Sequence, residues 1–102
     1  MTYTTTEVAK ASRATVRAIH LWDNQGLLGE VGRNAVHDRV FEQSHIGRAR
    51  LITAARMAGM SLAEIDAAFQ NPKAMADLHT QVEDTMIFLR RVRDDIYREY
   101  DL

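Results

Sequence analysis

The chain has 102 residues, of which 46% are hydrophobic, a formal net charge of −1 and no cysteine. These are the properties of one soluble globular domain with a modest core and no apolar run long enough to span a membrane. The absence of cysteine excludes disulfides, thiolate metal sites and thiol redox sensing, and the N-terminus lacks the features of a secretory signal, so a cytoplasmic protein is expected.

Two short helices are expected at the N-terminus. Thr4 and Glu7 have the Thr-x-x-Glu spacing of a capping box, which predicts a first helix through about Ser12. Thr15 is a hydroxyl residue suited to capping a second helix, and Gly26 is suited to ending it. The two helices would be joined by a tight turn.

The second helix carries two polar side chains on one face. Arg17 and His20 are three residues apart, which places them on the same side of a helix. Two short helices with such an outward face are typical of a helix-turn-helix. Arg17 has the chemistry to contact a guanine edge or a phosphate oxygen, and His20 to donate to either. The alternative for Arg17 is a solvated helix face.

A loop or hairpin is expected next. Residues 29–37 read Gly-Glu-Val-Gly-Arg-Asn-Ala-Val-His, and two glycines with an asparagine mark a turn. Leu27–Leu28 and Arg39–Phe41 are the short apolar segments expected to form its two arms. The alternative is a solvated loop with scattered charges.

Two further helices are expected in the middle of the chain. The first runs from about Gln43 to Ala58 and ends at Gly59. Ser61 and Glu64 form a second capping box, which starts a short helix. Arginines would line the outer side of the longer helix: Arg48, Arg50 and Arg56.

The C-terminal segment, from about Lys73 to Tyr100, has the pattern of one long helix. Its apolar residues recur at three- and four-residue steps, close to four heptads: Met75, Leu78, Val82, Met86, Leu89, Val92 and Ile96. A lone helix with this stripe would expose a larger apolar patch than monomers normally do. We therefore expect a two-stranded coiled coil, with folding back onto the chain's own domain as the alternative.

Residues 3–28, YTTTEVAKASRATVRAIHLWDNQGLL, resemble the N-terminus of MerR-type transcriptional regulators. The chain departs from that pattern at Arg13, where the family turn often has Gly, and at residues 20–23, which read His-Leu-Trp-Asp instead of Arg-Tyr-Tyr-Glu. The resemblance resumes at Arg39–Phe41, which matches the Arg-x-Tyr of the family's wing. Residues 57–65 are similar to the family's Leu-Gly-Phe-Ser-Leu-Glu-Glu-Ile segment.

The resemblance implies a winged helix-turn-helix whose second helix enters the major groove while the wing approaches adjacent phosphates. Arg13 would be a phosphate contact in the turn, and Trp22 would either lie near the groove, as the family's Tyr does, or belong to the core. The long C-terminal helix would pair antiparallel with its twin. The residues expected to contact DNA are Arg13, Thr15, Val16, Arg17, His20, Trp22, Arg33, His37 and Arg39.

The resulting expectation is a mainly all-α protein with a small β wing. Residues 1–71 would form the DNA-binding domain and residues 72–102 the dimerisation helix. Residues 1–61 carry a balance of +3 and residues 62–102 a balance of −4, which fits a DNA-binding head with a separate association element. The expected function is transcriptional regulation in a bacterial cytoplasm, by activation or repression.

The expected partners are double-stranded DNA, a second copy of the chain and, as a further candidate, RNA polymerase, with no membrane. No cofactor or metal is expected. Metal sensors of the resembled family use cysteines near the end of the dimer helix, and its drug sensors carry an additional domain. We therefore expect no small-molecule effector domain, since the sequence ends at Leu102.

Enzymatic activity is not expected. The four histidines are spread along the chain without a metal-ligand spacing, and no phosphate loop or nucleophile elbow is present. Two other functions remain open. One is an excision factor that bends DNA, although such proteins usually lack the long helix. The other is a protein-binding modulator that resembles the CbpM-type partners of a DnaJ-like co-chaperone, for which a basic helix and wing would be unnecessary.

Overall fold

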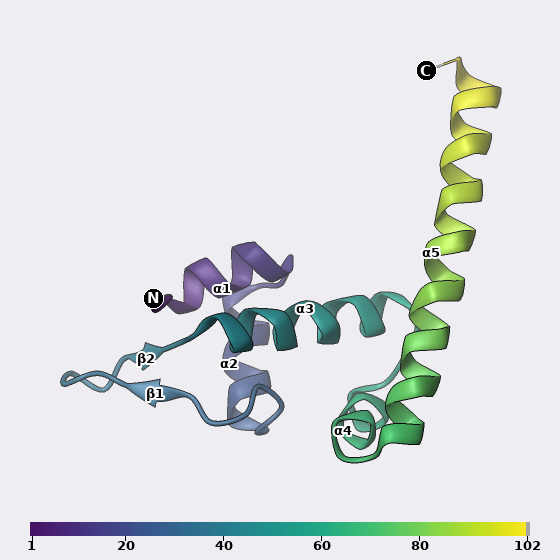
Figure 1. Ribbon diagram of the computed structural model, residues 1–102. Coiled ribbons are helices and arrows are strands. Elements are labelled where there is room, and N and C mark those ends of the chain that lie inside the picture. The colour runs from purple at the N-terminus through teal and green to yellow at the C-terminus, as the bar shows by residue number, and fades with distance from the viewer. Residues whose placement is uncertain (102) are drawn as a thin grey trace. The chain divides into compact units, whose positions relative to one another are not determined.

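The structure is a computed structural model and describes residues 1–101. These residues form a mainly helical fold with one antiparallel hairpin, and this confirms the expected fold class (Figure 1). The chain divides into two compact units, residues 1–54 and the residues from Ala55 onward. In chain order the elements are α1 (Thr5–Ser12), α2 (Val16–Asn24), β1 (Gly32–Arg33), β2 (Arg39–Val40), α3 (Gln43–Met57), α4 (Leu62–Gln70) and α5 (Pro72–Tyr100).

Both N-terminal helices begin where the sequence predicts. The Thr4 hydroxyl accepts the backbone N–H of Glu7, and the Glu7 carboxylate accepts that of Thr4, which completes a capping box at the start of α1. The Thr15 hydroxyl accepts the N–H of Ala18 at 3.0 Å at the start of α2. After α2 ends, Gly26 takes a left-handed conformation with φ of 76°.

The core of the first unit is built from apolar side chains of its three helices and of the segments that flank the hairpin. Val8 of α1, Ile19 of α2 and Ile52 of α3 are fully buried, as is Phe41, which follows β2. Backbone hydrogen bonds of 2.7 and 3.0 Å join Tyr3 to Phe41, so the N-terminal segment lies beside the end of the hairpin. Helices and hairpin are therefore fixed to one another around a single core.

The expected arms of the hairpin were wrong in part. Leu27 and Leu28 form no strand but lie in the turn after α2, 3% and 2% exposed. The first arm is Gly32–Arg33, which pairs with Arg39–Val40. The reason is that the core beneath α2 takes both leucines, whereas the first arm of the hairpin is solvated on both faces. Arg48, expected on the outer side of α3, is half-buried and donates from Nε to the Leu27 carbonyl at 2.7 Å.

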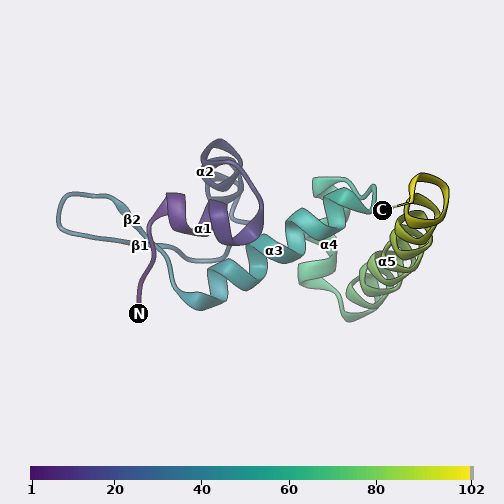
Figure 2. The ribbon, with the colours of Figure 1, turned by 90° about the horizontal axis from the view of Figure 1, so that it is seen from above.

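In the second unit, α4 and α5 lie side by side (Figure 2). Ser61 and Glu64 form the expected capping box at the start of α4. Two hydrogen bonds with Ser61 lower the pKa of the Glu64 carboxyl. The larger effect comes from the Ser61 backbone and the smaller one from the Ser61 hydroxyl. The Asn71 side chain accepts the N–H groups of Lys73 and Ala74, which caps α5 ahead of its first residue, Pro72.

Helix α5 extends well beyond α4 (Figure 1). Leu78, near its start, is 3% exposed, whereas Met86, Leu89 and Ile96 are 44%, 48% and 40% exposed. The predicted apolar stripe is therefore covered only along its first part within the described chain. Neither α5 nor any other helix in residues 1–101 is long and apolar enough to cross a membrane.

Candidate nucleic-acid interface

The two sides of α2 differ in exposure. Ile19 is fully buried and Trp22 is 7% exposed, so this side packs into the core. Of the two interpretations of Trp22, the structure favours the core, and the expected DNA contact is not supported by its position. Arg17 and Leu21 lie on the opposite, exposed side, four residues apart. Within residues 1–101, Arg17 makes no side-chain hydrogen bond or ion pair.

The first residues of α2 have distinct roles. The Thr15 hydroxyl is used as the N-cap, so this expected site residue orients the helix start. Val16 follows as the first helical residue and is 39% exposed. His20, one turn further on, is half-buried at the edge of the exposed face. Both Val16 and His20 are therefore accessible, in different degrees, beside Arg17.

The turn between α1 and α2 is made by Arg13. Its φ and ψ of 57° and 39° are left-handed, a conformation that costs an L-residue about 1–2 kcal/mol and glycine almost nothing. This explains why the resembled family often has glycine at this place. The Arg13 side chain is exposed and forms no ion pair among the described residues. Arg13 therefore presents a free cation ahead of the start of α2.

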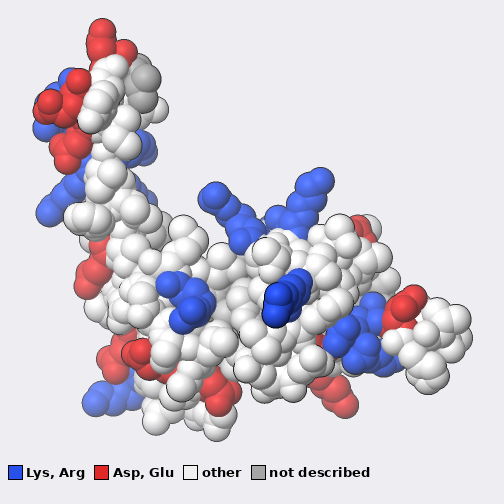
Figure 3. Space-filling model, turned by 180° about the vertical axis from the view of Figure 1, so that it is seen from behind, with Lys and Arg blue, Asp and Glu red and all other residues white. Residues whose placement is uncertain are grey.

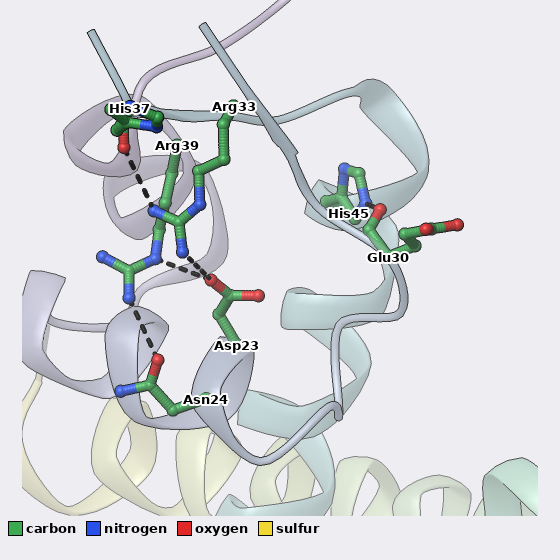
Figure 4. A network of polar contacts seen from close by, with 7 residues as sticks. All are labelled: Asp23, Asn24, Glu30, Arg33, His37, Arg39 and His45. Atoms are coloured by element: carbon green, nitrogen blue, oxygen red, sulfur yellow. Dashed lines mark hydrogen bonds and ion pairs between the residues drawn. The ribbon is translucent and has the colours of Figure 1, made fainter.

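The hairpin is joined to α2 by an ion-pair network (Figure 4). Arg39 Nε lies 2.6 Å from Asp23 Oδ2, and Arg39 Nη2 donates to Asn24 Oδ1 at 3.1 Å. Arg33 Nη2 lies 3.8 Å from the same Asp23 oxygen, and Arg33 Nη1 donates to the His37 carbonyl at 3.5 Å. The Asp23 carboxylate thus contacts both arginines of the hairpin, Arg33 and Arg39.

The two arginines are held to different degrees. The side chain of Arg39 is 18% exposed and that of Asp23 is 11% exposed, so their contact is largely shielded from water. The side chain of Arg33 is 45% exposed and its contact with Asp23 is long. A shielded, short ion pair is much stronger than a long, solvated one. Arg39 therefore fixes the hairpin against α2, while Arg33 is available to other anions.

The tip of the hairpin is ordered by one asparagine. The Asn34 Oδ1 accepts the N–H groups of Val36 and Asp38, both at 3.0 Å, and the Asn34 carbonyl accepts the N–H of His37. His37 takes a left-handed conformation with φ of 65° and is exposed. The expected site residue His37 therefore stands on a preorganised tip.

His45 is an anchor that the sequence did not reveal. It is 6% exposed, its Nδ1 accepts the N–H of Glu42 at 2.8 Å, and its Nε2 lies 2.8 Å from the Glu30 carbonyl. Because Nδ1 accepts, the proton of the neutral ring sits on Nε2 and is donated to Glu30 (Figure 4). The ring thereby ties the entrance of the hairpin to the start of α3, and a histidine flanked by Ser44 and Ile46 gives no sequence signal for this role.

Four of the residues expected to contact DNA line one groove: His20, Arg33, His37 and Arg39. An open hollow of about 550 Å³ lies between the start of α1, the middle of α2 and the hairpin. Its lining combines hydroxyl, imidazole and guanidinium groups: Thr2, Tyr3, Thr4, Thr5, Thr6, Glu7, His20, Arg33, Asn34, His37, Asp38, Arg39 and Val40. Among residues 1–101 no three His, Asp or Glu side chains form a group that could hold a metal.

Charge is unevenly paired on this surface. In Figure 3, several Lys and Arg side chains project singly, whereas blue and red side chains lie together near the end of the hairpin. Among the contacts of the described residues, Asp23 is shared by Arg33 and Arg39, while Arg13 and Arg17 are unpaired within residues 1–101. The turn and the start of α2 therefore carry two positive charges, those of Arg13 and Arg17, that no described acidic side chain neutralises.

The chain is similar to known proteins at the level of family, sequence and structure. Residues 3–71 match the model of the MerR HTH family of regulatory proteins. The nodulation protein NolA of Bradyrhizobium elkanii is 33% identical over 72 residues, which are 71% of this chain and 33% of NolA. The chain thus spans about a third of the length of the curated relatives it matches.

Two solved structures are similar over most of the chain. HiNmlR, a MerR family regulator lacking the sensor domain and bound to promoter DNA, is 25% identical, with a TM-score of 0.68 over 92% of this chain and 80% of HiNmlR. The N-terminus of MtaN, the Bacillus subtilis multidrug transporter activator, is 26% identical, with a TM-score of 0.66 over 97% of this chain and 94% of that one.

Proposed function

The chain belongs to the MerR HTH family of regulatory proteins, and on this premise we propose that it binds promoter DNA sequence-specifically as a homodimer. The observation that carries this proposal is the exposed face of α2, where Arg17 has no partner within residues 1–101. A helix of this kind fits the major groove with its first turns against the base edges. Arg17 is the residue best suited to contact a guanine.

The turn and hairpin would supply the phosphate contacts. Arg13 presents a free cation ahead of α2, and Arg33 is exposed enough to exchange its long contact with Asp23 for a phosphate oxygen. His37 stands on the ordered tip and would add a donor. Arg39, held by Asp23, would act mainly by positioning the hairpin. Such contacts fix the register of a protein on DNA, whereas base contacts give specificity.

Dimerisation through α5 is supported by its exposed apolar side chains. Met86, Leu89 and Ile96 follow the heptad spacing and are 40–48% exposed. A second copy of α5 would remove them from water, and an antiparallel arrangement would present two α2 helices to a two-fold symmetric site. In this proposal, residues 1–71 bind DNA and residues 72–102 mediate dimerisation.

The solved relatives agree with this proposal. HiNmlR is bound to promoter DNA, and this chain shares its fold over most of its length. A promoter-bound regulator would act in the bacterial cytoplasm, with RNA polymerase as the further partner at the promoter. Regulation could proceed by DNA distortion or by occlusion, and both use the same contacts.

The test is a fluorescence-anisotropy titration against double-stranded DNA from upstream of the gene, with scrambled DNA for comparison, at several salt concentrations. Specific binding that weakens steeply with salt is expected. Arg17→Ala should cost about 1–3 kcal/mol of binding free energy. Lys73→Ala, which removes an exposed cation at the start of α5, is the matched control and should have little effect.

A second experiment tests whether the protein binds operators elsewhere in the genome. The protein is incubated with a genomic fragment library at low salt, and bound fragments are sequenced. Absence of any enriched fragment would contradict the proposal. It would favour the protein-binding modulator that the sequence left open, because that function needs no DNA contact.

A further inference from the structure

The exposed face of α2 contains an apolar residue that the fold does not use. Leu21 is 46% exposed, whereas Ile19 and Trp22 on the other side of the helix are buried. It follows Arg17 by four residues and precedes Asn24 by three, so all three share one face. Leu21 therefore lies in the middle of the surface proposed to enter the major groove.

A single exposed leucine is common on protein surfaces and by itself carries no meaning. Leu21 differs because of its neighbours and its place. The side chain next to it on one side is the unpaired Arg17, and on the other side Asn24 Oδ1 already accepts from Arg39. The hairpin residues Arg33 and His37 are exposed in the same unit and line a hollow with His20, which adjoins Leu21 in α2. Docking of this face on DNA would necessarily cover Leu21.

The chemistry of leucine restricts what it can contact there. It has no hydrogen-bonding group, so it gains nothing from a phosphate oxygen, and covering it against a polar base edge would leave that edge unpaired. The major groove offers one apolar group, the C5 methyl of thymine. The resembled family has tyrosine at this place, and leucine removes its hydroxyl.

We infer that Leu21 contacts the C5 methyl group of a thymine in each half-site and thereby helps to determine the sequence that is bound. The inference rests on the proposed function, because it requires α2 to lie in the major groove. Arg17 would then read a guanine on the same face, and the two residues together would select a guanine and a thymine a short distance apart. Leu21 is thus a specificity-determining residue that the sequence patterns did not single out.

The experiment removes the methyl group from the DNA and the side chain from the protein in turn. A duplex enriched from a random library by the wild-type protein is used, and each thymine is replaced singly by deoxyuridine, which lacks only the C5 methyl. Anisotropy titrations compare the wild type, Leu21→Ala and Met57→Ala. Met57 is 61% exposed, lies at the end of α3 and serves as the control for the loss of an exposed apolar side chain.

The expected result is one position per half-site at which deoxyuridine weakens wild-type binding by about fourfold, the effect of one methyl group kept from water. Leu21→Ala should bind the unmodified duplex more weakly and show no further loss at that position. Met57→Ala should behave as the wild type does. Because Leu21 is solvent-exposed and alanine favours helix, the variant should fold normally, as thermal unfolding would show.

Two outcomes would overturn the inference while leaving the proposed function intact. One is specific binding that no single deoxyuridine weakens. The other is an equal loss in the wild type and Leu21→Ala, which would mean that another group contacts the methyl. Failure of the wild type to enrich any duplex would instead contradict the proposed function itself, and this inference with it.

Discussion

Asp23 in α2 and Arg39 in β2 form an ion pair of 2.6 Å between residues that are 16 positions apart in the chain. Both side chains are largely shielded from water, and Arg33 approaches the same carboxylate at 3.8 Å. The contact fixes the orientation of the hairpin relative to the helix proposed to read DNA. The Asp23 carboxylate therefore helps to set the angle between these two elements, together with the hydrogen bond from Arg39 to Asn24.

Asp23→Asn tests this role. The variant keeps the shape of the side chain but removes its charge, leaving Arg39 partly buried with a weaker partner. We expect the free energy of unfolding to fall by about 2 kcal/mol, the value of a hydrogen bond to a charged group. Urea denaturation measures this change. Asp38→Asn is the control, because the Asp38 carboxylate is exposed at the tip, and an equal loss in both variants would contradict the role of Asp23.

Arg13→Gly should separate stability from binding. Glycine relieves the left-handed conformation of residue 13, so the free energy of unfolding should rise by about 1 kcal/mol. The same change removes a proposed phosphate contact, so DNA affinity should fall and the slope of log affinity against log salt should decrease by about 1. Arg13→Ala should lose affinity equally without the gain in stability. Unchanged affinity in both variants would mean that Arg13 does not contact DNA.

The dimerisation proposal is tested by two neighbouring residues of α5. Leu89 and Ile87 are 48% and 45% exposed, but only Leu89 belongs to the heptad stripe, and Ile87 lies on the far side of the helix. Leu89→Lys should convert a dimer to a monomer in sedimentation-equilibrium experiments, because a charge is buried at the centre of the stripe. Ile87→Lys should remain dimeric. A monomeric wild type at micromolar concentration would contradict the proposal.

The capping box of α4 predicts a small pH dependence. Hydrogen bonds from Ser61 hold the pKa of Glu64 below its ordinary value in the folded protein. Stability from this contact is therefore present above the ordinary pKa of a glutamate and is lost as pH falls through the lowered value. Glu64→Gln keeps a capping side chain without titrating, so the wild type should be the more stable protein above the ordinary pKa of a glutamate, and the difference in thermal unfolding should shrink as the pH is lowered. Parallel pH profiles would show that the contact contributes nothing.

The features that the sequence predicted correctly are local ones. Thr4, Thr15 and Ser61 cap helices within three residues of themselves, so short spacing patterns were sufficient. The long helix α5 was also predicted, because its apolar period extends over many turns. The hairpin was expected in the right place, from its glycines and the asparagine that orders its tip.

The features that the sequence missed depend on contacts between distant residues. The arms of the hairpin were placed partly at Leu27–Leu28, since apolar pairs occur in strands and in cores alike, and only the folded chain shows which applies. The Asp23–Arg39 pair and the His45 anchor link segments 15 or more residues apart, and no local pattern encodes them. The choice between core and DNA contact for Trp22 could not be made from the sequence for the same reason, because the burial of Trp22 depends on what α2 packs against.

The pairing of Tyr3 with Phe41 bears on the order in which the protein folds. The third residue of the chain finds its backbone partners only after 38 further residues have been added. During synthesis the N-terminal segment therefore cannot form these hydrogen bonds until Phe41 has been added, whereas α1 and α2 can form earlier from contacts close in sequence. We expect the hairpin to be among the last parts of its unit to be completed, so that the proposed DNA-binding surface is completed late in folding.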